Sequence, residues 1–108
     1  METVLVPLRP RVKICCIQSL EEAELAVRYG ASAIGLVSEM PSGPGPIPEE
    51  LIARIASRVP PGVDSFLLTS KQDPGAVIEQ HRRMRTTTIQ LVDSFPLAGY
   101  SKLRVGMP

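Results

Sequence analysis

The sequence predicts an α/β fold with a parallel sheet and the element order β-α-β-α-β-α-β. Short apolar runs rich in β-branched residues alternate with segments whose apolar residues recur at helical spacing. The runs also show little polar alternation, as is typical of parallel strands covered on both faces. At 108 residues the chain is long enough for one small domain, and right-handed crossovers are expected between its strands.

The first strand and helix are predicted near the start of the chain. Residues 11–17, "RVKICCI", are apolar and β-branched and are expected to form a strand. Ser19 is expected to cap the helix that follows, because Ser19 and Glu22 have capping-box spacing. Gly30 stands where a helix end favours a left-handed residue, and residues 32–38, "SAIGLVS", predict the second strand.

A second helix is predicted after the segment "EMPSGPGPIP", which is rich in Gly and Pro and is expected to be a loop. Pro48 suits the first turn of that helix, and Glu49 and Glu50 suit its positive N-terminal end. The apolar stripe of the helix consists of Leu51, Ile52, Ile55, Ala56 and Val59.

Two more strands and one helix complete the predicted order. Residues 64–70, "DSFLLTS", are expected to form the third strand, and residues 86–93, "TTTIQLVD", the fourth. Between them, Asp73 is expected to cap a helix that has Pro74 at its first position. The apolar face of this helix is thin and consists of Val77, Ile78 and Met84.

Residues 1–108 are therefore predicted to form a single domain. Residues 1–10 are expected to be an N-terminal extension. Residues 94–108 show no strong period and are expected to be an irregular tail, which could hold a broken helix.

Composition and charge argue against several classes of function. The formal net charge of +1 gives no reason to expect nucleic acid or an anionic membrane as partner. The N-terminus has no basic region or small-residue cleavage site, so no signal peptide is expected. No apolar run approaches the ~18 residues of a membrane-spanning helix. The two Cys are adjacent and cannot form an ordinary disulfide staple, which favours a reducing, cytoplasmic location.

Two motifs carry a resemblance to one known family, and that resemblance runs from about Arg11 to Asp93. Residues 12–37, "VKICCIQSLEEAELAVRYGASAIGLV", resemble the opening of phosphoribosylanthranilate isomerase, the TIM-barrel enzyme of tryptophan biosynthesis. That family begins with a strand reading V-K-I-C-G-I and continues, after a capped helix, with G-A-D-A-L-G-F-V. Residues 88–93, "TIQLVD", resemble its fourth strand, V-V-Q-L-H-G. The resemblance implies that the chain is the N-terminal half of a (βα)8 TIM barrel.

The resemblance also implies an aldose–ketose isomerase that performs an Amadori rearrangement on a phosphorylated sugar amine, without cofactor or metal. In the family, the Cys of the first strand is the general base and an Asp of the fifth strand is the general acid. Cys15 is therefore the candidate base, and no acid can be assigned within four βα units. Lys13 and Gln90 are candidate substrate-binding residues. In a strand Lys13 and Cys15 share one face, where Lys13 could lower the thiol pKa, while Cys16 would point toward the helix layer.

Departures from the family pattern leave other functions open. Cys16 stands where the family has Gly, and Ser42-Gly43-Pro44 stands where the family has S-P-R, whose Arg holds the anthranilate carboxylate. The phosphate-binding loops after strands seven and eight lie beyond a half-barrel. The alternative function is that of a degenerate, non-catalytic member acting as a binding or interaction module. A different sugar-phosphate barrel enzyme is the third possibility.

Each candidate residue also has an ordinary structural interpretation. Cys15 could be a buried packing residue, Lys13 a lysine with its ammonium in water, and Gln90 a hydrogen-bonded structural side chain. Asp93 is expected to be a turn residue, and the lone His81 has no second metal ligand near it in sequence. A half-barrel leaves two sheet edges and an apolar face open, so a second copy or a C-terminal half is expected to cover them.

Overall fold

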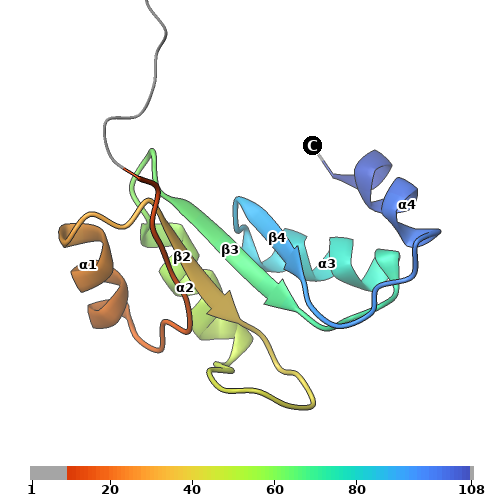
Figure 1. Ribbon diagram of the computed structural model, residues 1–108, viewed down its shortest axis with the longest axis horizontal. Helices are drawn as coiled ribbons and strands as arrows, with labels where there is room; N and C mark the ends of the chain where they lie inside the picture. Colours follow the sequence, from red (N-terminus) through yellow and green to blue (C-terminus); the bar gives the residue numbers. More distant parts are fainter. Residues whose placement is uncertain (1–9, 108) are drawn as a thin grey trace, which may run out of the picture.

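The computed structural model describes residues 10–107, so all but the last residue of the predicted N-terminal extension lies outside the described residues. A four-stranded parallel sheet in the order β1-β2-β3-β4 alternates with helices along the chain, which confirms the predicted order (Figure 1). The strands are β1 (Lys13–Ile14), β2 (Ala33–Val37), β3 (Asp64–Thr69) and β4 (Thr88–Leu91). The helices are α1 (Leu20–Arg28), α2 (Glu49–Arg58), α3 (Pro74–Met84) and α4 (Gly99–Gly106).

The centre of the sheet carries the main core. All five residues of β2 are buried, and β2 pairs along its whole length with β3. Alternate residues of these strands, Ile34, Leu36 and Leu67, point to the helix layer and pack with the helices. The predicted apolar stripe of α2 is confirmed, because Ile52 and Ile55 are buried in the same cluster.

Local signals set the ends of α1 as predicted. The Ser19 hydroxyl accepts the Glu22 backbone N–H at 3.1 Å, and the Glu22 carboxylate accepts the backbone N–H of Gln18 at 2.9 Å. At the other end Gly30 has φ +100°, a left-handed conformation that costs little without a Cβ. The Ala31 N–H then donates back to a carbonyl of the helix, which gives a Schellman-type ending.

The starts of α2 and α3 differ in how closely they follow the prediction. Asp73 caps α3 through a 3.0 Å hydrogen bond from the Ala76 N–H, and Pro74 is the first helical residue, as predicted. Pro48 was expected in the first turn of α2 but is its N-cap, with φ −61° and ψ 148°. The extended ψ of Pro48 lets its carbonyl begin the helix while its own missing N–H costs nothing.

The first strand is much shorter than predicted. Residues 11–17 were expected to form a strand covered on both faces, whereas β1 contains only two residues, and both are exposed. Within the described part of the chain β1 pairs only with β2, so it is an edge strand. Cys16 has φ +58°, which takes the backbone out of the extended conformation directly after Cys15.

The C-terminal region contains a helix where an irregular tail was expected. In α4 the buried Leu103 packs with Phe95 and with Val77 of α3. The ring of Tyr100 lies edge-on to that of Phe95, with 5.3 Å between the ring centroids. The periodic signal of α4 is weak because this helix depends on a small tertiary cluster rather than on a long apolar stripe.

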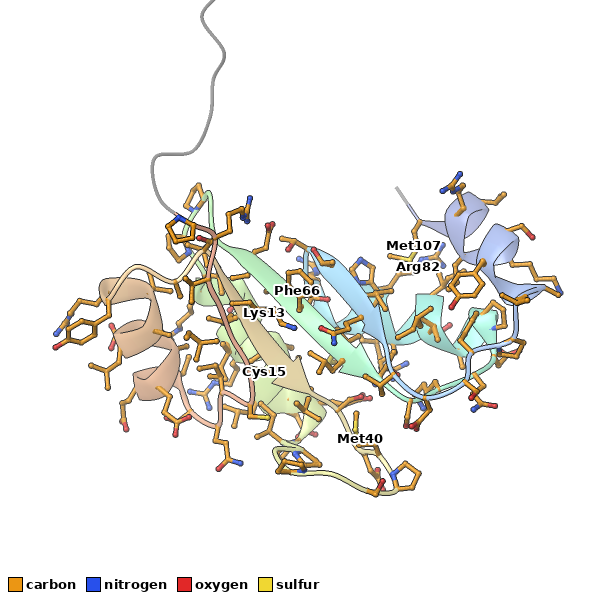
Figure 2. All side chains as sticks on the ribbon, in the orientation of Figure 1. Lys13, Cys15, Met40, Phe66, Arg82 and Met107 are labelled. Carbon is orange, nitrogen blue, oxygen red and sulfur yellow. The ribbon has the colours of Figure 1, made fainter. Side chains whose placement is uncertain are left out.

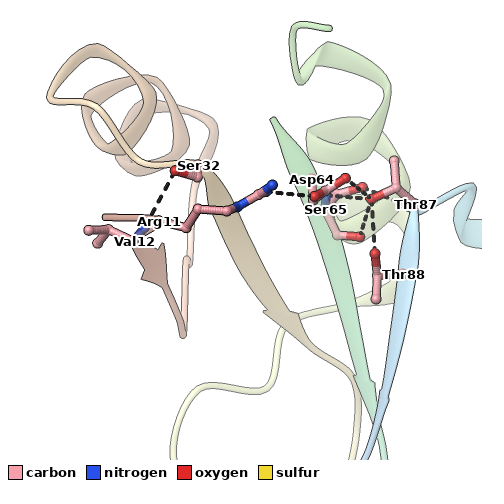
Figure 3. A network of polar contacts seen from close by, with 7 residues as sticks. All are labelled: Arg11, Val12, Ser32, Asp64, Ser65, Thr87 and Thr88. Atoms are coloured by element: carbon pink, nitrogen blue, oxygen red, sulfur yellow. Dashed lines mark hydrogen bonds and ion pairs between the residues drawn. The ribbon is translucent and has the colours of Figure 1, made fainter. Parts of the chain in front are cut away.

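A polar network joins the amino-terminal ends of the strands (Figure 3). Arg11 Nη2 lies 2.9 Å from Asp64 Oδ2, and the Thr87 hydroxyl donates to Asp64 Oδ1 at 3.2 Å. The Ser65 N–H donates to the Thr87 hydroxyl at 2.9 Å, and the Thr87 N–H donates to the Ser65 hydroxyl at 3.0 Å. This end of a parallel βα sheet is the end that contributes stability, so the network is assigned to strand register.

Candidate functional site

The candidate site lies on the face of the sheet that points away from the helices, called here the inner face. Parallel pairing aligns Gly35 with Phe66, and Leu68 with Gln90, so all four belong to this face. Lys13 of β1 belongs to it too, because Lys13 pairs in register with Ala33, the residue next to the helix-facing Ile34. In Figure 2 the side chains of Lys13 and Phe66 lie close together across the sheet.

Lys13 and Gln90 are brought together from opposite edges of the sheet. Lys13 Nζ donates to Gln90 Oε1 at 2.5 Å, a contact between residues 77 apart in the sequence. Three strand spacings of about 4.8 Å separate β1 from β4, so two long side chains together span the inner face. Lys13 Nζ also lies 4.8 Å from the ring centroid of Phe66, within cation–π range. The assignment of both residues to substrate binding stays a prediction.

Cys15 lies directly beyond the last residue of β1, at the carboxyl end where barrel enzymes gather catalytic side chains. The residue is exposed and its thiol is free, so it is not the buried packing residue of the alternative interpretation. The thiol rests over Gly35 of β2: a Cβ added there would come within 2.8 Å of Cys15 Sγ. Gly35 therefore provides the space in which the Cys15 side chain lies.

Cys16 does not point toward the helix layer as predicted. Its thiol faces the loop after β2 and donates to the carbonyl of Pro44 at 3.8 Å. The prediction was wrong because it assumed an extended strand through Cys16, whereas φ +58° rotates this side chain away. Burial raises the pKa of the Cys16 thiol, Cys15 raises it further by charge and hydrogen bonding, and Lys13 opposes the shift. Cys16 is thus poorly suited to ionise.

Two other titratable residues, Asp93 and His81, have surroundings that fit their ordinary structural interpretations. Asp93 follows β4 with φ +64° and is exposed, which fits the turn interpretation. His81 Nδ1 lies 3.2 Å from the Thr86 hydroxyl on the helix side, and burial lowers the pKa of its imidazole. Among residues 10–107 no three His, Cys, Asp or Glu side chains are grouped so that they could hold a metal ion.

Phe66 also belongs to the site, although it is not among the residues predicted from the sequence. Its ring lies between Lys13 and the β4 edge and helps to hold the lysine ammonium over the sheet. The available signal was the alternation within β3, where Ser65 and Leu67 are fully buried on the helix side and Phe66 is only half-buried. The apolar run "FLLT" in β3 makes this alternation hard to recognise from the sequence alone.

The chain is similar in sequence and fold to phosphoribosylanthranilate isomerases. It is 40% identical over 81 residues to the N-(5'-phosphoribosyl)anthranilate isomerase of Geobacter metallireducens, covering 75% of this chain and 40% of that protein. The isomerase of Thermus thermophilus superposes with a TM-score of 0.81 and 30% identity, over 92% of this chain and 49% of the other. A phosphoribosyl anthranilate isomerase solved with reduced 1-(o-carboxyphenylamino)-1-deoxyribulose 5-phosphate superposes with a TM-score of 0.80 and 29% identity, over 88% and 48%.

The similarity covers most of this chain and only about half of each relative. No family model matches the chain. The chain spans about half the length of the relatives it matches, from 40% to 49% in the examples above. Nearly all of the described fold takes part in the match, and the solved relatives share its parallel strands and helices. By sequence and by fold, this chain is similar to one half of the TIM barrel of the phosphoribosylanthranilate isomerases.

Proposed function

We propose that the chain supplies half of the site of an aldose–ketose isomerase of tryptophan biosynthesis, acting on a phosphorylated sugar amine. The observation that carries this proposal is the exposed Cys15 thiol at the carboxyl end of β1, in a chain whose relatives are named for this reaction. A relative bound to a reduced product analogue supports the same substrate class.

The chemistry needs one base and one acid. An Amadori rearrangement begins when an acid protonates the ring oxygen of the sugar, after which a base removes the C2′ proton. Cys15 is the proposed base, because its sulfur is exposed at the mouth of the inner face and can approach a bound sugar. Lys13 and Gln90 are proposed to bind the polar groups of the substrate. The acid is proposed to come from a second set of βα units.

Assembly is therefore part of the proposed function. Half of a barrel exposes its inner face, so a second copy or a C-terminal half must close the site for water to be excluded. A reducing, cytoplasmic location is proposed with it, since both thiols are free. No helix within residues 10–107 has the length and apolar character required to cross a membrane.

The test compares the two neighbouring cysteines in the assembled protein. The chain would be assayed for isomerisation of phosphoribosylanthranilate alone and together with the separately produced C-terminal half of the Thermus thermophilus relative. Cys15→Ser is expected to lower turnover by about 10²–10⁴-fold while binding of the reduced product analogue is kept. Cys16→Ser is the matched control and is expected to keep most of the turnover. Equal turnover in wild type and Cys15→Ser would remove Cys15 from the mechanism.

A non-catalytic interaction module is the second candidate function, and one observation favours it. The loop from residue 40 to residue 47 contains no Lys or Arg, so it offers no cation to a substrate carboxylate. This candidate predicts that the assembled protein fails to bind the reduced product analogue in calorimetry. Micromolar binding of that analogue would exclude it.

A further inference from the structure

Cys15 and Cys16 are two adjacent free thiols whose side chains lie over the same part of the fold. A Cβ added at Gly35 of β2 would come within 2.8 Å of Cys15 Sγ. A Cβ added at Gly45 would come within 2.8 Å of Cys16 Sγ, and Gly45 belongs to the loop that follows β2. Both thiols therefore face β2 and the loop that continues it.

The left-handed backbone at Cys16 explains why the two thiols share one side. In an extended strand, neighbouring side chains point to opposite faces, so adjacent cysteines would lie on different sides of the sheet. The φ of +58° at Cys16 breaks this alternation, and its thiol donates to the Pro44 carbonyl at 3.8 Å. Pro46 of the same loop forms a parallel bridge with Val37, the last residue of β2. The loop is thus held against the sheet beside both thiols.

The two thiols also act on each other. Burial raises the pKa of the Cys16 thiol, and Cys15 raises it further by charge and by hydrogen bonding. A hydrogen bond between two thiols requires that their sulfur atoms lie close together. The charge of Lys13 acts on the same thiol and opposes the shift. The two sulfur atoms therefore form one group, with a lysine ammonium in electrostatic reach.

A direct bond between the two sulfur atoms suits adjacent residues poorly. The Cα atoms of disulfide-linked residues usually lie about 4.4–6.8 Å apart, whereas a trans peptide holds neighbouring Cα atoms about 3.8 Å apart. An ion between the sulfur atoms relaxes this constraint. It replaces one bond of about 2.0 Å by two metal–sulfur bonds, each about 2.3 Å long in zinc thiolates. The pair is therefore better suited to hold an ion than to form a disulfide.

The number and kind of ligands select the ion. Thiolates favour soft ions such as Cu(I), which is satisfied by two sulfur ligands. A structural zinc ion takes four ligands, and among residues 10–107 no three His, Cys, Asp or Glu side chains are grouped around one point. A Cu(I) ion with two thiolates carries one negative charge, which the ammonium of Lys13 offsets.

We propose that Cys15 and Cys16 together bind one Cu(I) ion. Two copper–sulfur bonds form and both thiol protons leave to solvent, so Cu⁺ and two thiols give an anionic dithiolate and two H⁺. No electron is transferred in this step. The second ligand is a feature of this chain, since the family motif has Gly at the position of Cys16.

The metal site depends on the two thiols and not on the proposed reaction. Only its consequence for catalysis rests on the proposed function. When Cys15 is held in a copper–sulfur bond, its thiolate is not free to remove the C2′ proton of a sugar. Cu(I) is therefore expected to inhibit the proposed isomerase.

The test titrates the chain with Cu(I) in the absence of oxygen, in competition with the chromophoric chelator bicinchoninate. One ion per chain is expected. Cys15→Ser and Cys16→Gly each leave one thiol, and each is expected to weaken Cu(I) binding by about 10²–10⁴-fold, because the second sulfur no longer acts at high effective concentration. Cys16→Gly should fold, since Gly accepts the left-handed backbone, and circular dichroism checks both variants.

Met40→Leu is the matched control. It removes a thioether, another soft ligand for Cu(I), from the loop after β2. Met40 lines a crevice with Lys71 and Gln80 to which neither cysteine contributes. The affinity for Cu(I) is therefore expected to stay unchanged in this variant, and a loss of affinity would contradict a site made of two thiols.

Two further results would overturn the proposal. One is equally tight Cu(I) binding in the wild type and in either single-thiol variant. The other is a mass that doubles on loading with Cu(I) in sedimentation, because the two ligands would then come from different copies of the chain. The readout is affinity rather than turnover, so a chain without isomerase activity can still bind Cu(I) through both thiols. Failure of the metal site and failure of the proposed function are thus distinguished.

Discussion

The centre and the β1 edge of the sheet are built from similar residues but differ in strand length and in burial. β2 reads AIGLV and is buried at every position, while the residues around β1 read VKIC and are exposed. The difference lies in their neighbours, since β2 is flanked by β1 and β3 and β1 is flanked by β2 alone. An apolar, β-branched run favours a strand, but its length and burial depend on what pairs with each side.

The largest expected effect contrasts one core residue with one edge residue. Leu36→Ala removes a fully buried side chain at the centre and is expected to lower the free energy of unfolding by about 2–5 kcal/mol. Ile14→Ala at the edge is expected to cost less than about 1 kcal/mol, because Ile14 is already exposed. Urea denaturation of both variants beside the wild type measures the two values. Similar losses would show that edge and centre are equally packed.

The next largest effect on stability is expected at Gly35 of β2, which contacts Cys15 at the end of the edge strand. Gly35→Ala would place a Cβ 2.8 Å from Cys15 Sγ, so it is expected to push Cys15 and β1 outward and to cost about 1–3 kcal/mol. Thermal unfolding measures this cost, and alkylation of Cys15 in a Cys16→Ser background measures the change in access. Gly75→Ala in the first turn of α3 is the control: its Cβ would lie 3.2 Å from the end of the flexible Asp73 side chain, so the expected change is smaller than about 1 kcal/mol. An unchanged Cys15 alkylation rate in Gly35→Ala would contradict the described packing.

Cys16 offers a test of strain at the end of the edge strand. Its left-handed φ of +58° costs an ordinary residue about 1 kcal/mol, and Gly adopts this conformation without that cost. The family motif has Gly at this position, which fits the same backbone. Cys16→Gly is therefore expected to raise stability by up to about 1 kcal/mol in urea denaturation. A clear loss of stability would mean that the contact with Pro44 outweighs the backbone strain.

The smallest effect on stability is expected at Glu49, which links α2 to α3 on the helix side of the sheet. Glu49 of α2 accepts hydrogen bonds from Gln80 and Arg83 of α3, each at 3.1 Å. Partial burial by itself raises the pKa of Glu49, but these hydrogen bonds outweigh it and hold the pKa below its usual value of 4.5. The folded state therefore gains stability from Glu49 above pH 4.5, and loses it as pH falls through the lowered pKa.

Glu49→Gln measures that contribution. The side chain of Glu49 is 39% exposed, so solvent screening keeps the expected loss at neutral pH below about 1 kcal/mol. The difference between wild type and variant should shrink as the pH is lowered past the pKa of Glu49. A difference that stays constant over this pH range would show that the ionised carboxylate contributes nothing to stability.

Part of the site could be predicted from local sequence motifs, and the rest depends on contacts between residues far apart in the chain. Cys15 was found through a local motif, and its place at a strand end follows from the order of elements. The hydrogen bond between Lys13 and Gln90 joins residues 77 apart in the sequence. It could be located only once the pairing and register of all four strands were known. The direction of Cys16 was mistaken because one left-handed residue reverses the alternation on which strand-based reasoning depends.

The sequence alone determined the order of strands and helices, the caps of α1 and α3, and the resemblance to one half of a barrel. These features depend on contacts a few residues apart, which capping motifs and apolar periodicity record directly. Only the tertiary structure decided the short, exposed β1, the helix α4 and the meeting of Lys13 with Gln90 and Phe66. Each of these depends on burial against distant segments, and the free energy of burial belongs to the assembled sheet rather than to any stretch of the chain.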